Sequence, residues 1–110
     1  MKLNIYEKKE VIKTYETDKY DLLFGTVEDV ANALNLDEMK TGSDVEIIRM
    51  AMNLVMTSLG TVKDLMKDIF DGLTDEELRK VKVKEMAEVL VEVAKYTLAL
   101  MDIHIPKTKN

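Results

Sequence analysis

The segment from Asp44 to Phe70 constrains the fold most, because apolar residues recur along it at the three-and-four spacing of an α-helix. They form two overlapping stripes: Ile48, Met52, Val55, Leu59, Val62, Met66 and Ile69, and Ile47, Met50, Leu54 and Leu65. A helix that is apolar on more than one side is usually central, with neighbours on both flanks. We therefore expect one long central helix over 44–70, in which Gly60 marks close packing or a local bend.

Capping patterns mark where the helices begin. A Ser or Thr followed three residues later by an acid is the capping-box pattern, and it occurs at Ser43–Glu46, at Thr74–Glu77 and, as a variant, at Thr26–Asp29. Gly72 is placed to end the long helix in a left-handed conformation. Around the long helix, the pattern predicts shorter helices over 27–35, 75–80 and 84–101, with Val81 and Val83 entering the core at the break between the last two.

The first twenty residues have a different character. β-Branched and aromatic residues flank the polar "EKKE", which predicts a β-hairpin with strands near 3–7 and 10–16. The predicted fold is α+β and mostly α, an N-terminal β-hairpin followed by a bundle of about four helices, one long and central. We expect a single domain over 1–110, with the hairpin in 1–20, the helical part in 26–102 and a flexible tail in 103–110 that includes Pro106.

Composition narrows the classes of function. The formal net charge is −5 and basic residues are mostly interleaved with acids, so we expect no nucleic-acid partner. Cysteine is absent, which excludes disulfides and thiolate metal sites. The apolar run from Val89 to Met101 is interrupted by charges and is short, and the N-terminus lacks the apolar core of a secretory signal. We therefore expect neither a membrane partner nor export.

The chain shows no pattern typical of catalysis. His104 is the one histidine, and without a second histidine or a cysteine it cannot head a zinc site of the usual kind. Asp75, Glu76 and Glu77 are adjacent carboxylates, but they occupy the first turn of a predicted helix, where acids are favoured by the helix dipole. We expect no enzyme activity, no catalytic residues, no metal and no cofactor.

The predicted last helix is apolar around most of its circumference. Either it is a central core helix, or one of its faces binds another copy or a partner segment. The eight methionines of the chain allow the same two interpretations, core filling or a conformable binding surface. As candidate partner-binding residues we select Val89, Val93, Tyr96, Leu100, Met52 and Met56.

Three stretches carry a resemblance to a known family: "NIYEKKEVIKTYETDKYDLLFGTVEDV", "TGSDVEIIRMAMNLVMTSL" and "LMKDIFDGLTDEELRKVKVKEM". With these blocks in this order, the chain resembles the tail assembly chaperones of long-tailed, siphovirus-type bacteriophages and prophages of Gram-positive bacteria. The resemblance covers nearly the whole chain and depends on the order of the blocks, since the family has no catalytic signature.

The resemblance implies a non-enzymatic assembly factor of the bacterial host cytoplasm that is absent from the mature virion. It would bind the helical tape measure protein, keep it soluble and promote tail tube assembly, with the major tail tube protein as a further partner and with self-association into a homo-oligomer. A frameshifted longer product is compatible with the terminal "KTKN". The alternatives are a small structural tail component, such as a connector or completion protein, and a helical regulator of a host protein.

Overall fold

A computed structural model describes residues 1–104, with side chains up to residue 100. An antiparallel hairpin is followed, within the described residues, by a short 3-10 helix and six α-helices. The elements in chain order are β1 (Lys2–Glu7), β2 (Glu10–Glu16), η1 (Lys19–Asp21), α1 (Phe24–Ala33), α2 (Leu36–Thr41), α3 (Asp44–Thr57), α4 (Leu59–Ile69), α5 (Asp75–Leu78) and α6 (Val83–His104). The predicted fold class is confirmed. The proposed flexible tail lies outside the described residues from residue 105 onward.

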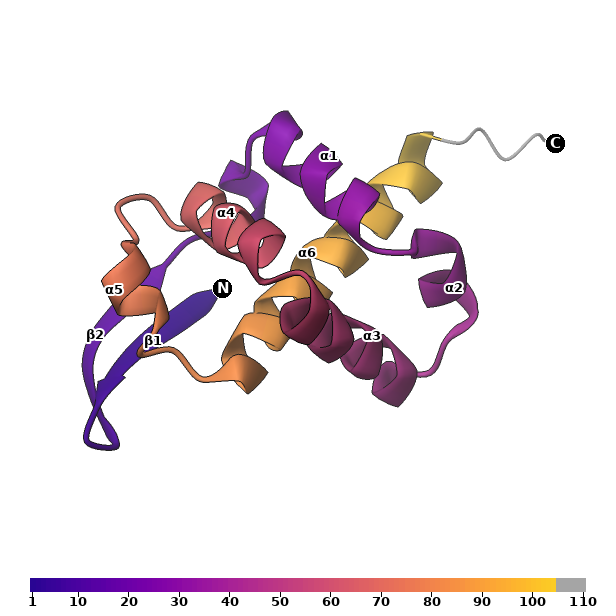
Figure 1. Ribbon diagram of the computed structural model, residues 1–110. Helices are drawn as coiled ribbons and strands as arrows, with labels where there is room; N and C mark the ends of the chain where they lie inside the picture. Colours follow the sequence, from indigo (N-terminus) through magenta and orange to yellow (C-terminus); the bar gives the residue numbers. More distant parts are fainter. Residues whose placement is uncertain (105–110) are drawn as a thin grey trace, which may run out of the picture.

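Helix α6 is the central element (Figure 1). It runs diagonally through the molecule. Helices α1 and α3 pack against it, α4 packs against α1 and α3, and β1 lies beside its first turns. The prediction that the 44–70 segment would be the central helix is therefore wrong. The helix that is apolar around most of its circumference takes that place, because it must contact several neighbours at once.

The segment 44–70 is two helices, contrary to the prediction of one. Helices α3 and α4 meet at an angle of 109°. The break is at Ser58, which has φ −134° and ψ 55°. Ser58 is both the C-cap residue of α3 and the N-cap residue of α4. The two apolar stripes thereby turn toward different neighbours. Of the two roles expected for Gly60, close packing is wrong, because an added Cβ would meet nothing within 4 Å, and the expected bend lies two residues earlier, at Ser58.

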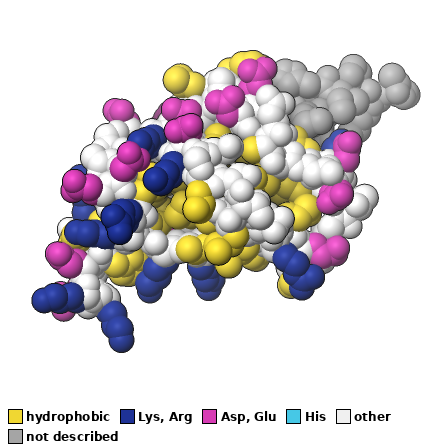
Figure 2. All heavy atoms as spheres, in the orientation of Figure 1, with side chains coloured by type: hydrophobic (Ala, Val, Ile, Leu, Met, Phe, Trp, Pro, Cys, Tyr) yellow, Lys and Arg dark blue, Asp and Glu magenta, His cyan; other side chains and the backbone are white. Residues whose placement is uncertain are grey.

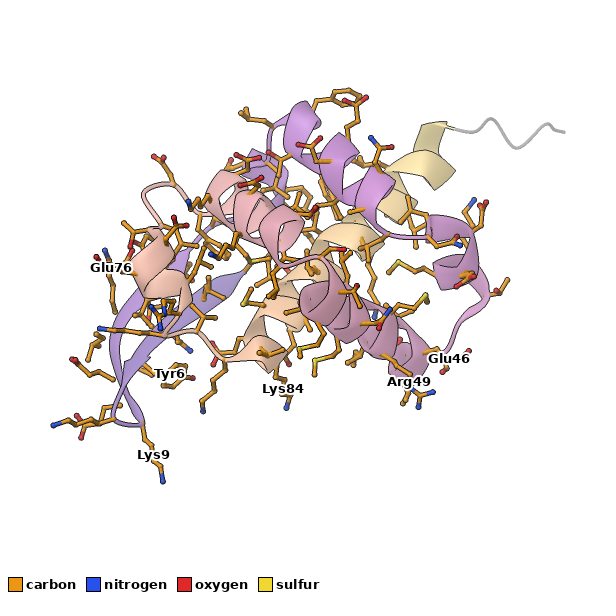
Figure 3. The ribbon with its side chains drawn as sticks, in the orientation of Figure 1. Tyr6, Lys9, Glu46, Arg49, Glu76 and Lys84 are labelled. Carbon is orange, nitrogen blue, oxygen red and sulfur yellow. The ribbon has the colours of Figure 1, made fainter. Side chains whose placement is uncertain are left out.

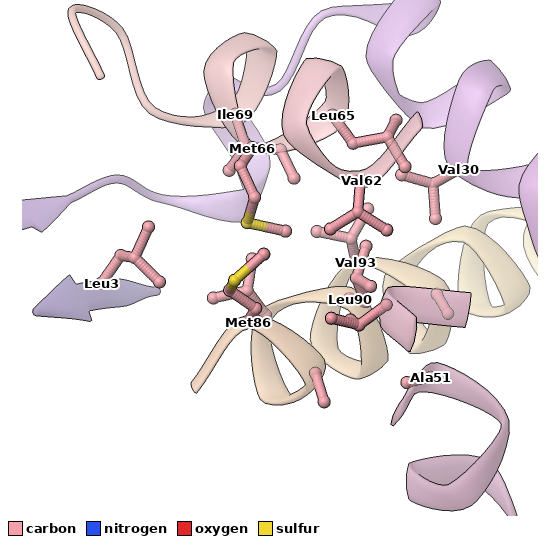
Figure 4. Close-up of a cluster of buried hydrophobic side chains, with 14 of the residues drawn as sticks. Leu3, Val30, Ala51, Val62, Leu65, Met66, Ile69, Met86, Leu90 and Val93 are labelled. Carbon is pink, nitrogen blue, oxygen red and sulfur yellow. The ribbon is translucent and has the colours of Figure 1, made fainter. Parts of the chain in front are cut away.

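The core lies between α6 and the elements that cover it (Figure 4). Met66 of α4 and Met86 of α6 point into the same apolar cluster, which Leu3 of β1 joins. On α6 the side chains that are 0% exposed are Ala87, Leu90, Val93 and Ala94. Two small and two branched residues make up this set, which allows neighbouring helices to approach α6 closely and fill the space between them.

The hairpin was predicted correctly, and its details explain how it is held. Lys8 and Lys9 form a two-residue turn with φ 51° and 72°, which is the left-handed pair that a type I′ turn requires. Ile12 has no register partner, so a bulge interrupts the ladder near the turn. The outer edge of β1 is covered, because the amide of Tyr6 donates to the carbonyl of Lys80 at 2.8 Å.

In the joint between α4 and α6, the turn and the start of α5 are also as predicted, although α5 ends at Leu78 and not at residue 80. Gly72 has φ +87° and Thr74 caps α5 in a complete capping box with Glu77. The hydroxyl of Tyr15, on β2, donates to Oε1 of Glu77 at 2.5 Å, and Nζ of Lys13 lies 3.1 Å from the other carboxylate oxygen. The hydrogen bond from Tyr15, with the charge of Lys13, lowers the pKa of Glu77 to about 2. Glu77 therefore fastens the joint to the hairpin.

Other predicted boundaries are wrong. Helix α1 begins at Phe24 without a side-chain cap, and Thr26 is buried inside it, so the Thr26–Asp29 capping box does not form. A short helix, α2, lies between the first two predicted helices, where none was predicted, and Asn35 caps it by accepting from the amide of Glu38. At the start of α6, Val81 is partly buried as expected, whereas Val83 is exposed.

Candidate partner-binding surface

The outer face of α3 carries a row of exposed apolar side chains, which we call the α3 stripe: Val45, Ile48, Met52 and Met56. Val45 is 65% exposed, Ile48 42% and Met56 67%, while Met52 is half-buried. Their spacing of three, four and four residues places one side chain on each successive turn, over about 16 Å of helix. Figure 2 shows hydrophobic side chains gathered over this part of the molecule. The α3 stripe has the shape of a docking face for another helix.

Local chemistry fixes the position of α3. Ser43 and Glu46 form the predicted capping box, and the hydrogen bonds from the Ser43 amide and hydroxyl lower the pKa of the Glu46 carboxyl. Nζ of Lys95 on α6 lies 3.3 Å from Oδ1 of Asp44, at the first residue of α3. The adjacent face of α3 buries Ile47, Ala51 and Val55, and Met52 of the stripe packs partly against the same core. The helix is therefore held by its inner face and its N-terminus, and the stripe runs along the exposed edge of that buried face.

Two of the six residues selected from the sequence lie on this stripe. Met52 and Met56 are one turn apart, and Met56 is among the most exposed apolar side chains of the described chain. Val89 and Val93, by contrast, are core residues with 4% and 0% exposure. They cannot contact a partner in this fold, which corrects their selection. The reason is that α6 is central, so its apolar faces are covered by the protein's own helices.

Tyr96 and Leu100 are half-buried on α6 and do not join the α3 stripe. The ring of Tyr96 packs edge-to-face against the ring of Tyr20, with 5.6 Å between the ring centroids. Tyr96 thus belongs to the part of α6 that faces η1. The six selected residues thus fall into three pairs. Val89 and Val93 are in the core, Tyr96 and Leu100 are half-buried farther along α6, and Met52 and Met56 are on the surface of α3, where a partner can reach them.

A second apolar area, which the sequence analysis did not select, lies where η1 leads into α1. We call it the η1–α1 patch: Tyr20, Leu23 and Phe24, which are 71%, 75% and 80% exposed. These are higher exposures than that of any α3 stripe residue. Three large apolar residues within a five-residue turn region are a signal that could have found it, since a turn offers few neighbours to cover them.

The carboxylates singled out from the sequence, Asp75, Glu76 and Glu77, occupy the first turn of α5. No group of three or more His, Cys, Asp or Glu side chains among the described residues could hold a metal ion. The acids at the start of α5 have structural partners, since Asp75 pairs with Lys67 at 2.5 Å and Glu77 binds Tyr15 and Lys13. The side chain of His104 is outside the described part.

No single described helix is long and apolar enough to cross a membrane, and α3 and α4 would reach the required length and composition only as a pair bent by 109°. Comparison of the chain with protein-family models, with curated proteins and with solved structures gave no match. The surface chemistry of the described residues is therefore the basis for the functional proposal.

Proposed function

We propose that this protein is a phage tail assembly chaperone that binds the tape measure protein and promotes tail tube assembly without enzymatic activity. The observation that carries the proposal is the α3 stripe, a row of exposed and half-buried apolar side chains on a helix whose adjacent face is anchored in the core. Such a row matches the apolar stripe of another amphipathic helix, in the helix-to-helix mode of peptide recognition.

The two methionines suit this role. The tape measure protein expected from the resemblance is a long helix whose apolar stripe changes in sequence along its length. Met52 and Met56 have unbranched thioether side chains that can repack against different apolar residues. A net charge of −5 would keep the complex soluble while those stripes are covered. Location in the host cytoplasm and absence from the finished virion belong to the same proposal.

Self-association into a homo-oligomer is a further part of the proposal, and the η1–α1 patch is the surface that supports it. Its three large side chains are mostly exposed in the single chain and lie apart from the α3 stripe. A second copy that covers them would leave the stripe free for the tape measure protein. The major tail tube protein remains a proposed additional partner.

Co-expression with the tape measure protein encoded in the same genome tests the proposal. The wild type should bring the tape measure protein into the soluble fraction and copurify with it. Met56→Glu should abolish copurification, because a charge would be buried against an apolar helix. Ile12→Glu is the matched control, since Ile12 is 52% exposed and lies on the hairpin.

Several results would contradict the proposal. A tape measure protein that stays insoluble with the wild type would do so, as would equal copurification of the wild type and Met56→Glu. Mass spectrometry of purified virions distinguishes the alternative of a structural tail component, which would be found in the particle.

The role of the η1–α1 patch in self-association is tested separately. Phe24→Glu should reduce the light-scattering mass of the free protein without affecting copurification.

A further inference from the structure

We infer that the α3 stripe selects amphipathic helices whose apolar stripe is flanked by aspartate or glutamate. This inference rests on the proposed function, because it concerns the same surface. The inference specifies the charge of the residues beside the partner's apolar stripe, which the proposed function does not specify.

Basic side chains border the stripe, although the protein as a whole is acidic. The segment 79–84 that leads into α6 contains four basic residues and no acid. Lys80 pairs with Glu7 and Lys82 lies over the ring of Tyr6, so these two face the hairpin and Lys84 is the lysine that the inference uses. Figure 3 shows Lys84 and Arg49 projecting on the same side of the molecule, one from the start of α6 and one from α3. In Figure 2, dark blue side chains follow the lower edge of the hydrophobic area.

The acids of α3 itself are already engaged. Asp44 pairs with Lys95 at 3.3 Å, and the carboxylate of Glu46 accepts hydrogen bonds from Ser43. No ion pair within the described part of the chain includes Arg49 or Lys84. Arg49 is close enough to Glu46 for its charge to help lower the pKa of that carboxyl, but neither cation is held in an ion pair among the described residues, so both can contact a partner. Glu88, one turn after Lys84 on α6, is an exposed acid that limits the selectivity on that side.

Charges at the rim of an apolar contact contribute mainly to specificity and to the rate of association. Acids along the partner helix would face Arg49 and Lys84, whereas lysines there would be repelled. Exposed pairs are individually weak, so a few of them should distinguish the two kinds of partner by about tenfold in affinity. The net charge of −5 acts in the opposite direction, because it attracts basic peptides from a distance. A preference for acidic flanks would thus be a property of the local surface.

Two designed helical peptides test the inference. Both carry the same leucine stripe, one with glutamates beside it and one with lysines, and binding to the full-length protein is followed by fluorescence anisotropy. We expect the glutamate peptide to bind about tenfold more tightly at low salt, and the difference to shrink at high salt. The double variant Arg49→Glu/Lys84→Glu should reverse the preference, and Met56→Glu should weaken binding of both peptides.

The control is Lys8→Glu/Lys9→Glu, which makes the same change in charge at the hairpin turn. It should leave the preference intact. Equal affinities, a preference for lysine, binding of neither peptide, or an equal effect of the control would each overturn the inference. So would a stripe that is occupied by a second copy, seen as a dimer by light scattering that Met56→Glu dissociates. If Met56 is still required for copurification of the tape measure protein, the proposed function stands and only the charge selectivity fails.

Discussion

Replacing Glu77 with glutamine should destabilise the protein in a pH-dependent way. The carboxylate accepts from the hydroxyl of Tyr15 at 2.5 Å and from the amide of Thr74 at 3.1 Å, and it lies 3.1 Å from Nζ of Lys13. Glutamine keeps one oxygen acceptor but loses the charge. Its amide group, a donor, would face the ammonium of Lys13.

The expected loss follows from these contacts. Exchanging a charged acceptor for a neutral one weakens the Tyr15 bond by about 1 kcal/mol. Loss of the pair with Lys13 adds roughly 0.5 kcal/mol, a small value because the Lys13 side chain is 53% exposed and the pair is screened by water. A total of about 1.5 kcal/mol should lower the Tm by about 6–8 °C in a domain of this size.

The sign of the pH dependence is fixed by the direction of the pKa shift. The hydrogen bond from Tyr15 lowers the pKa of Glu77 from 4.5 to about 2 in the folded state. The stabilisation is therefore fully present above pH 4.5 and is lost as the pH falls toward 2. Urea unfolding at several pH values should show that the unfolding free energies of the wild type and of Glu77→Gln become equal as the pH falls through that window.

Glu76→Gln is the matched control, since Glu76 is a neighbouring acid of the same helical turn and is exposed. It should cost only a few tenths of a kcal/mol through the helix dipole. A double-mutant cycle with Tyr15→Phe should give a coupling energy of about 1 kcal/mol. Two results would refute the stabilising role of Glu77 at the joint. One is a difference in unfolding free energy between the wild type and Glu77→Gln that does not change with pH. The other is an equal loss of stability in the control variant.

Three further predictions concern the fold and can be checked by thermal and urea unfolding. Lys8→Asn/Lys9→Gly should stabilise the hairpin by about 1 kcal/mol, because both positions have positive φ; an unchanged or lower stability would contradict the turn assignment. Gly72→Ala should destabilise by about 1 kcal/mol at φ +87°, whereas Gly60→Ala, with free space around the added Cβ, should be neutral or stabilising. Val93→Glu should abolish cooperative unfolding, because it buries an unpaired charge at a fully buried position; a folded variant would disprove the core assignment.

The features that the sequence predicted correctly are those with local causes. The helix starts at Ser43 and Thr74 need only a side chain and a backbone amide three residues apart, and both capping boxes are present. The left-handed conformation of Gly72 is likewise a property of one residue. Local pattern also fixed the hairpin, whose strands begin and end close to the predicted residues.

The features that were missed depend on tertiary contacts. The sequence predicted at most a local bend at Gly60, whereas the chain breaks by 109° at Ser58, through which the apolar pattern continues. The binding surface likewise depends on tertiary contacts. Val93 and Met56 are both apolar residues on apolar helix faces, and only the position of α6 at the centre buries the first and leaves the second exposed.

Methyl NMR with labelled methionines, recorded on the free protein and on its copurified complex with the tape measure protein, tests the central claim most directly. The α3 stripe predicts that the methyl signals of Met52 and Met56 shift or broaden on complex formation. Those of Met66 and Met86, which are buried in the core, should remain unchanged. If Met52 and Met56 are unaffected in a complex that has formed, the tape measure protein binds elsewhere and the proposed role of the stripe is wrong.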